Sequence, residues 1–330
     1  MAKKCGVSVS TVSKALNASG KIGFETVKKI KETAQEMGYQ SNVIAMALSR
    51  KKIEIAVILP NRPPEVMNQF EKGFQTAEEQ FHKFGINFTY FRYQPENDID
   101  DIQKILPLLT QQFNGMILIP SFGFDTYSKQ MKELNLPTVM LLSGTESYRG
   151  IATVTVNAVV VGTIAAQFLK IASKNDQAAI ITGRKEYSIH RENIEGFKKT
   201  AEKLGLKTVG IFETDDEMQR AYDVTCDLLK QQKDLGGIFV TSYVAPMVCN
   251  ALNHSGKQTE ITVIGVDLFP ESVNCLLDRS LDALIFQNQE QQALSAVRIL
   301  MDYFNGSRKF SDVLVKPELV LSSNVCCYEF

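Results

Sequence analysis

The sequence is best interpreted from Gly6–Leu16, GVSVSTVSKAL. Glycine can adopt the tight turn that joins two helices, and Ser8 is a favourable N-cap for the helix that follows. Behind this cap, one apolar stripe is predicted from Val9, Val12 and Leu16, with hydroxyls and a lysine turned outward. We interpret the stretch as a helix-turn-helix whose second helix fits the DNA major groove. An ordinary amphipathic helix hairpin is the alternative.

The residues around this stretch favour DNA over the plain hairpin. A further helix is expected over Glu25–Met37, because apolar residues recur on one face and Gly38 follows its end. Residues 1–52 contain ten lysines and arginines against three glutamates, a net charge of +7. Since the whole chain carries −1, the remaining residues sum to −8. A basic segment attached to an acidic body is typical of a domain that contacts phosphates while the body is repelled by them.

Three segments resemble the LacI/GalR family of bacterial transcription regulators: GVSVSTVSKALN at 6–17, ETVKKIKETAQEMGYQSN at 25–42, and NVIAMALS at 42–49, which looks like the family's hinge helix. The resemblance implies a helix-turn-helix headpiece at 1–41, a hinge helix and linker at 42–52, and a two-lobed effector-binding and dimerisation body at 53–330. Two features depart from the family pattern. Only Met1–Cys5 precede the turn, so the first helix is truncated, and Ser41 stands where relatives usually carry proline.

The resemblance also assigns DNA contacts to residues of the headpiece. Base edges are expected to face Val9, Ser10 and Lys14, with Lys14 the candidate for guanine O6 or N7. The other expected contacts fix the protein on the DNA backbone: Ser8, Thr11, Ser13, Asn17, Thr26 and Tyr39. For the hydroxyls on the second helix, the alternative is that they only solvate its outer face.

The hinge segment is expected to enter the minor groove. Leu48 is flanked by small residues such as Ala45, which let the backbone approach DNA closely. In the family, a leucine of this helix acts with its dimer mate as a wedge that kinks the central base step. The alternative is a leucine that only packs within a short helix.

From Lys52 onward, aliphatic strands alternate with amphipathic helices in two series that meet near Asn157. The expected strands are 53–59, 87–93, 116–120, 138–142, 178–182, 208–212, 237–241, 262–266, 283–286 and 318–322. The expected helices are 65–84, 100–112, 158–172, 189–204, 218–231, 246–254, 272–278 and 290–304. This alternation predicts an α/β body of two doubly wound parallel sheets, with a ligand beyond the carboxyl ends of the strands. The resemblance likewise implies a body like a periplasmic binding protein.

Two strand ends nominate an effector site. Asp267 ends VIGVD and Gln287 ends ALIFQ, a pair similar to the acid and amide that bind adjacent hydroxyls in sugar-binding bodies. For Asp267, capping of the next helix is an equal alternative. The other candidates are Glu65, Ser121, Phe122, Tyr187, Arg191, Asn193 and Tyr243, the aromatics among them for stacking on a sugar ring or for packing between the lobes.

The pattern of this site departs from that of relatives at two positions. Leu142 and Ser143 occupy the place of a usual aspartate, and Asn193 that of a usual arginine. We therefore expect a sugar derivative more readily than a simple unmodified sugar.

No catalytic motif is found. The three histidines lie in separate segments, and no P-loop, G-x-S-x-G or G-x-G-x-x-G after a strand occurs. Six cysteines lack C-x-x-C spacing, so we expect reduced thiols, with Cys326 and Cys327 on alternate faces of a terminal strand. No apolar run reaches the ~18 residues that span a bilayer, and no signal peptide is evident.

We therefore expect a cytoplasmic homodimeric repressor that is not an enzyme, needs no cofactor, holds no metal and has no membrane partner. Its expected partners are double-stranded, pseudo-palindromic operator DNA and a small, sugar-like effector. The alternative is a cytoplasmic ligand-binding protein with a defective DNA-binding headpiece.

Overall fold

The computed structural model describes residues 2–16, 26, 29, 30, 33, 52–109, 113–145 and 147–328. At the N-terminus, helix α1 (Ala2–Cys5) is joined to α2 (Val9–Leu16) by a turn in which Gly6 has a φ of +71°. This left-handed conformation favours glycine. The Ser8 hydroxyl accepts a hydrogen bond of 3.1 Å from the backbone N–H of Thr11. The predicted glycine turn and serine cap are therefore confirmed.

The apolar side of α2 differs from the predicted stripe. Val12 and Ala15 are buried with Cys5 and Ile30, whereas the Val9 side chain is 76% exposed. Val9 is the first residue of α2, ahead of the turn that packs on the headpiece core. The stripe prediction was therefore wrong for Val9, and its outward position agrees instead with the expected base contact.

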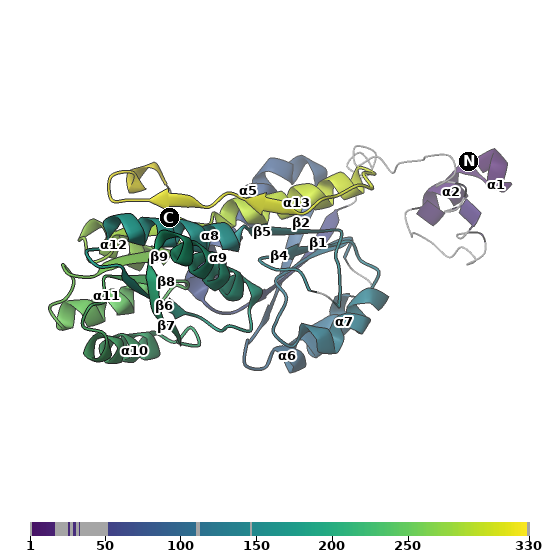
Figure 1. Cartoon of the computed structure of the whole chain (residues 1–330). Helices are drawn as coiled ribbons and strands as arrows, with labels where there is room; N and C mark the ends of the chain where they lie inside the picture. The colour runs from purple at the N-terminus through teal and green to yellow at the C-terminus, as the bar shows by residue number, and fades with distance from the viewer. Residues whose placement is uncertain are drawn as a thin grey trace.

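The body forms two lobes, each built on a six-stranded sheet (Figure 1). In lobe 1 the sheet order is β11-β5-β4-β3-β1-β2 and every pairing is parallel. Its strands are β1 (Ile53–Pro60), β2 (Ile86–Tyr93), β3 (Gly115–Leu118), β4 (Thr138–Leu141), β5 (Ala152–Val156) and β11 (Val313–Val315).

In lobe 2 the order is β12-β10-β9-β8-β6-β7, and only β12 runs antiparallel to its neighbour. Its strands are β6 (Gln177–Thr182), β7 (Lys207–Glu213), β8 (Gly237–Val240), β9 (Thr262–Val266), β10 (Ala283–Phe286) and β12 (Glu318–Val320). The chain passes between the lobes after β5, after β10 and after β11.

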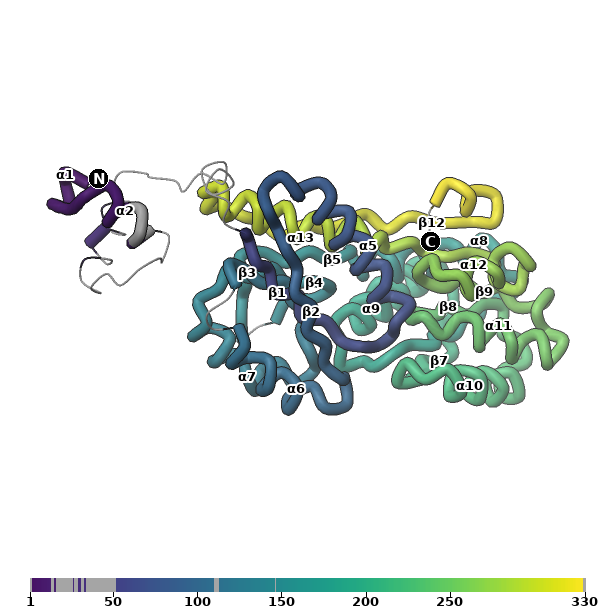
Figure 2. Tube along the Cα trace, turned by 180° about the vertical axis from the view of Figure 1, so that it is seen from behind, coloured from purple at the N-terminus to yellow at the C-terminus, as the bar shows by residue number. Residues whose placement is uncertain are grey.

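Helices cover both faces of each sheet. They are α5 (Pro64–Phe81), α6 (Asp98–Ile105), α7 (Phe124–Glu133), α8 (Ala158–Ala172), α9 (Ser188–Leu204), α10 (Met218–Gln231), α11 (Ala245–His254), α12 (Pro270–Leu277) and α13 (Gln289–Phe304). In lobe 1, one apolar cluster includes Phe74 of α5 and Leu300 of α13, and the other includes Ile102 of α6 and Met131 of α7. Figure 2 shows α13 beside α5.

In lobe 2, Phe197 of α9 packs in the cluster that contains α8, and Leu228 and Val248 pack in the cluster of α10–α12. Aliphatic side chains on both faces explain why the strands are nearly continuous apolar runs. The predicted two-lobed α/β fold is confirmed.

Three elements were not predicted. Strand β5 belongs to the first sheet although we placed no strand there; its ATVTV alternates between buried and half-buried residues, as a strand with one buried face does. Strand β11 has three residues, too few for a pattern. Helix α7 buries Phe124, Tyr127 and Met131, but the polar residues between them mask that spacing.

The C-terminal cysteines also differ from expectation. Cys326 and Cys327 lie in a 3-10 helix, Val325–Cys327, and both are exposed, so they do not alternate along a strand. In the sequence this segment follows β12 after a turn in which the Asn324 side chain accepts the backbone N–H of Leu321 at 2.7 Å. That turn ends the strand before the cysteines.

Candidate functional site

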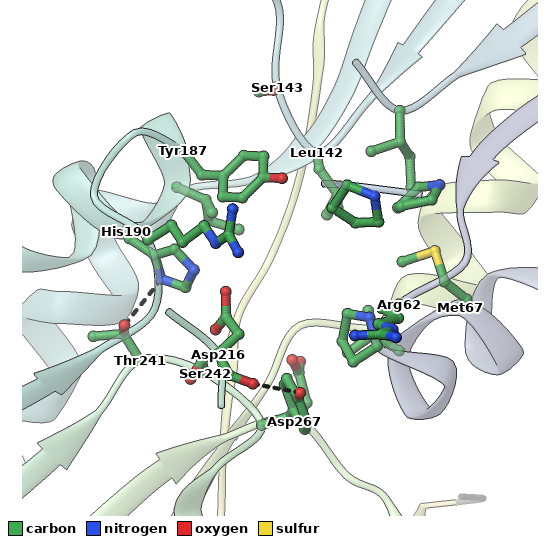
Figure 3. Close-up of a pocket in the computed structure, with 18 of the residues that line it drawn as sticks. Arg62, Met67, Leu142, Ser143, Tyr187, His190, Asp216, Thr241, Ser242 and Asp267 are labelled. Carbon is green, nitrogen blue, oxygen red and sulfur yellow. Dashed lines mark hydrogen bonds between the residues drawn. The ribbon is translucent and has the colours of Figure 1, made fainter. Parts of the chain in front are cut away.

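A cavity of about 220 Å³ lies between the lobes, beyond the carboxyl ends of the strands. Its walls come from the loops after β1 to β4 of lobe 1 and from those after β6 to β10 of lobe 2. Figure 3 shows Tyr187 and His190 on one wall and Arg62, Met67 and Leu142 on the other. Because parallel strands direct their carboxyl ends to one edge, each sheet supplies several side chains to the same space.

Asp267 is the most buried carboxylate of this cavity. Its backbone has a left-handed φ of +66°, and its Oδ1 accepts hydrogen bonds from Gln287 Nε2 at 2.9 Å and Gln289 Nε2 at 2.6 Å. Burial raises the pKa of this carboxyl to about 6, while the two amide hydrogen bonds act in the opposite direction. The alternative capping role does not apply, because the N-terminus of α12 is closed by the Ser272 hydroxyl, which accepts the N–H of Phe269.

His190 was left without a role by the sequence, yet it is buried in the cavity wall. Its Nδ1 lies 2.9 Å from Thr241 Oγ1, whose own proton is donated to Thr182 Oγ1 at 2.8 Å. Nδ1 is therefore the donor, and Nε2 of the neutral ring is an acceptor. Burial lowers the pKa of His190, and Asp216 opposes that shift.

Gly183 makes the close approach of these groups possible. A Cβ at this position would lie 2.2 Å from Asp216 Oδ1 and 2.5 Å from His190 Nε2. The two acceptor atoms thus share the space above a residue without a side chain. Asp216 itself has a φ of +61°, and its carbonyl oxygen accepts a hydrogen bond of 2.6 Å from the Tyr243 hydroxyl. In the sequence, the glycine directly after β6 could have indicated that other groups approach the backbone closely here.

Four of the nine predicted effector residues line the cavity: Tyr187, Tyr243, Asp267 and Gln287. The other five lie outside its lining in this structure. Arg191 donates to the carbonyl oxygens of Lys185 and Glu186 at 2.9 and 2.5 Å, which directs it along its own loop. Glu65 lies in the first turn of α5; burial raises the pKa of Tyr243, and the charges of Asp216 and Glu65 raise it further.

The remaining three are held elsewhere by local contacts. The Ser121 hydroxyl is hydrogen-bonded to that of Tyr127 in α7. The Phe122 side chain is 65% exposed. Asn193 is buried where α9 meets α8, with its carbonyl oxygen against Gly162. Ser121 and Phe122 were predicted from their nearness to a strand end and Asn193 from the family pattern, and neither signal specifies side-chain direction.

Leu142 and Ser143, which we expected in place of an aspartate, do line the cavity. Leu142 has a φ of +64° and takes part in the apolar cluster of lobe 1. Lobe 1 therefore presents an apolar surface here instead of a carboxylate.

The headpiece exposes the hydroxyl and valine predicted to meet DNA. Ser8, Val9 and Ser10 are exposed, and Thr11 is half-buried with its Oγ1 2.8 Å from the Ser8 hydroxyl. Thr26 is helical and half-buried. Ser13 and Lys14 belong to α2, but their side chains lie outside what the structure describes, as do Asn17, Tyr39, Ala45, Leu48 and the whole predicted hinge, Asn42–Ser49.

Within the described part of the chain, no helix is long and apolar enough to cross a membrane. In the same residues no group of three or more histidine, cysteine, aspartate or glutamate side chains is arranged to hold a metal ion.

Comparison with known proteins matches two parts of the chain. Residues 1–42 match the lacI family of bacterial regulatory proteins, and residues 55–308 match the periplasmic binding protein domain. Catabolite control protein A of Priestia megaterium is 24% identical over 327 residues, 97% of this chain and 96% of the relative. The ribose operon repressor of Halalkalibacterium halodurans is 26% identical over 284 residues, 82% and 80% of the two chains.

Solved structures share the fold of the body. A solute binding protein of an ABC transporter from Burkholderia graminis, in complex with D-arabinose, superposes with a TM-score of 0.77 at 23% identity, over 85% of this chain and 99% of the other. The headpiece match, the match over most of the body and the end-to-end similarity to named regulators agree with one another. The chain therefore carries a DNA-binding domain of the lacI family of bacterial regulatory proteins at residues 1–42, and its body, residues 55–308, belongs to the periplasmic binding protein domain family.

Proposed function

We propose that this chain is a cytoplasmic, dimeric transcriptional repressor whose affinity for a pseudo-palindromic operator is set by a small sugar-like effector bound between the lobes. The observation that carries the proposal is the combination of two features in one chain. A serine-capped helix exposes Val9 and Ser10, and the body has a cavity at its strand ends that is lined by several polar side chains among apolar ones. The first feature suits a major groove, and the second suits a ligand that biases two lobes.

For DNA, we propose that Val9, Ser10 and Lys14 read base edges and that Leu48 of the hinge enters the minor groove. The remaining proposed contacts, Ser8, Thr11, Ser13, Asn17, Thr26, Tyr39 and Ala45, fix orientation along the backbone. A single headpiece contacts one half-site, so specific binding requires two headpieces related by a two-fold axis.

For the effector, we propose that Asp267 and Gln287 bind hydroxyl groups and that Tyr187 and Tyr243 contact the ring. Both tyrosines and Asp267 line the same cavity. The Gln287 and Gln289 amides are bonded to Oδ1 of Asp267. The relatives support a sugar-like class, since one is named a ribose operon repressor and a solved structure with this fold holds D-arabinose. The small cavity suits a ligand of that size.

The test begins with selection of duplexes from a random library by the full chain. The selected duplex is then titrated with protein at several salt concentrations, and binding is measured by fluorescence anisotropy. A repressor should select a pseudo-palindrome and bind it with an affinity that falls steeply with salt. A ligand-binding protein with a defective headpiece would select no sequence, and that outcome would reject the proposal while leaving the cavity unexplained.

A further inference from the structure

The carboxylate of Asp267 is buried without a cation. Its side chain is 5% exposed, and the partners of its Oδ1 are the neutral amides of Gln287 and Gln289. Among the described residues no lysine, arginine or histidine forms an ion pair with it, and burial raises its pKa. A buried carboxylate that lacks a cationic partner is costly, so a ligand that supplies the missing charge gains binding energy from it.

Several polar atoms of the same cavity lack hydrogen-bond partners in the part of the chain that the structure describes, and most of them are acceptors. Within the described chain, Ser242 Oγ, Gln287 Oε1 and Gln289 Oε1 have no hydrogen-bond partner, although all three side chains line the cavity and are 2–5% exposed. From lobe 1, the oxygens Glu65 Oε2 and Gln69 Oε1 are also buried without a partner. The Gln69 amide donates to the carbonyl oxygen of Leu268, next to Asp267, so this oxygen-rich region extends across both lobes.

The ionisable side chains of the cavity wall are mainly acidic. The lining contains five carboxylates, Glu96, Asp215, Asp216, Glu217 and Asp267, against two arginines. Arg62 pairs with Glu96 at 3.5 Å, and Arg184 is the one lining arginine with no ion pair among the described residues. His190 lies beside Asp216 in the same wall, and burial lowers its pKa, which disfavours its charged form. The cavity therefore attracts cations and rejects anions.

We propose that the effector carries a protonated amine on a polyol, as an amino sugar does, and that its ammonium group binds the Asp267 carboxylate. This inference rests on the proposed function, in which the cavity is the effector site. An ammonium group has three donors and no acceptor, which matches a surface with surplus oxygens. Hydrogen bonds between ionised groups are stronger than those of a neutral hydroxyl, which is why the amine and not the ring decides affinity. The hydroxyls of the ligand accept from Arg184.

The experiment compares matched sugars on the full chain at pH 7.5. D-Glucosamine, D-galactosamine and D-mannosamine are titrated by calorimetry beside D-glucose, D-galactose and D-mannose and beside the three N-acetyl derivatives. At least one amine should bind about tenfold or more tightly than both its hydroxyl and its N-acetyl partner. The inference is overturned if a neutral sugar binds as tightly as its amine, or if none of the three amines binds.

Two variants locate the amine. Asp267→Asn should bring the affinity ratio of amine to neutral sugar close to one, whereas Asp234→Asn, an exposed carboxylate outside the cavity, should leave the ratio unchanged. Gln289→Lys supplies a cation beside Asp267 from within the chain and should weaken amine binding without unfolding the protein. A preference for the amine that persists in both cavity variants would reject Asp267 as its partner.

The outcome for the effector is separate from that for DNA. If the chain binds its selected duplex but prefers neutral sugars, the proposed function stands and the amine inference fails. If the amines bind as expected but no duplex is selected, the ligand class stands and the regulatory function fails.

Discussion

The Asp267 carboxylate and the Gln287 amide are joined by a hydrogen bond of 2.9 Å across two neighbouring strands. The strands β9 and β10 are parallel, and Val266 is paired with Ile285 in register. Because the intervening α12 crosses over between them, residues twenty apart in the sequence end side by side at the cavity. The contact holds the acid in place without neutralising its charge.

The first prediction concerns stability and pH. Burial raises the pKa of Asp267 from 3.8 to about 6, so the native state holds this proton more tightly than the unfolded chain does. The stability from this group is fully present below pH 4 and is lost as the pH rises through about 6. The loss amounts to about 3 kcal/mol. Asp267→Asn should remove this pH-dependent loss of stability, because an asparagine does not titrate. The new Asn amide can donate a hydrogen bond to the unpartnered Oε1 of Gln289.

Urea unfolding of both proteins between pH 4 and pH 7 measures this effect. The free energy of unfolding of Asp267→Asn should increase relative to that of the wild type as the pH rises, by about 3 kcal/mol over the range. Asp234→Asn serves as the exposed control and should follow the wild type. Parallel curves for wild type and Asp267→Asn would show that Asp267 does not titrate abnormally.

The second prediction separates two glycines by what surrounds them. A Cβ on Gly162 of α8 would lie 1.9 Å from the backbone oxygen of Asn193, so Gly162→Ala should force α8 away from α9 and cost about 3 kcal/mol. A Cβ on Gly183 would meet the side-chain tips of Asp216 and His190, which can move, so Gly183→Ala should cost about 1 kcal/mol.

The variant that loses less stability, Gly183→Ala, should lose more affinity for ligand. Gly183→Ala displaces groups of the cavity wall and should weaken binding of the tightest sugar, whereas Gly162→Ala should leave its affinity nearly unchanged. Thermal unfolding and calorimetry on the same preparations provide both readouts. Equal losses of stability for the two variants would contradict the packing argument.

The sequence predicts the fold better than it predicts the site. Continuous aliphatic strands such as Ile53–Pro60 have one interpretation, because a parallel sheet buries both faces. Strand β5 was missed although its ATVTV alternates as a strand does, and α7 was missed because its apolar residues are separated by polar ones. The strand ends predicted Asp267 and Gln287 correctly as neighbours.

The direction of side chains at the start of α9 was not predicted. Arg191 directly follows His190 in the first turn of this helix, yet its guanidinium donates to the carbonyl oxygens of Lys185 and Glu186 while His190 is buried at the cavity. The position of Arg191 depends on which backbone carbonyls the preceding loop leaves unpaired. The contacts of His190 with Thr241 join segments fifty-one residues apart, which a single sequence does not reveal.

The third prediction concerns base recognition by α2. If Lys14 contacts guanine, Lys14→Ala should cost about 1–3 kcal/mol and relax the preference at one base pair in each half-site. Anisotropy titrations on the selected duplex and on its three single-base replacements at each position measure this. An equal loss on every duplex, with a shallower salt dependence, would instead identify Lys14 as a phosphate contact.

The fourth prediction concerns assembly. Since each headpiece contacts one half-site, the chain should be a dimer at micromolar concentration, and a duplex with one half-site should bind far more weakly than the full operator. Sedimentation equilibrium gives the mass, and anisotropy gives the two affinities. A monomer in sedimentation together with equal affinity for both duplexes would reject the dimeric mode of binding.

The fifth prediction concerns the switch between the cavity and DNA. Segments as short as Asn42–Ser49 are marginal helices on their own, so their order should depend on how the two bodies hold them together on DNA. An effector that draws the lobes together changes that spacing. Asp267→Asn and Gln287→Ala should therefore abolish the response to effector, while operator affinity without effector stays within about twofold of wild type, because neither residue contacts DNA.

The measurement is an operator titration of each variant with and without the tightest sugar, beside Asp234→Asn, which should keep the full response. A full response in both cavity variants would show that the effector binds elsewhere. Loss of operator binding without effector would show that the two residues support the fold and not the switch.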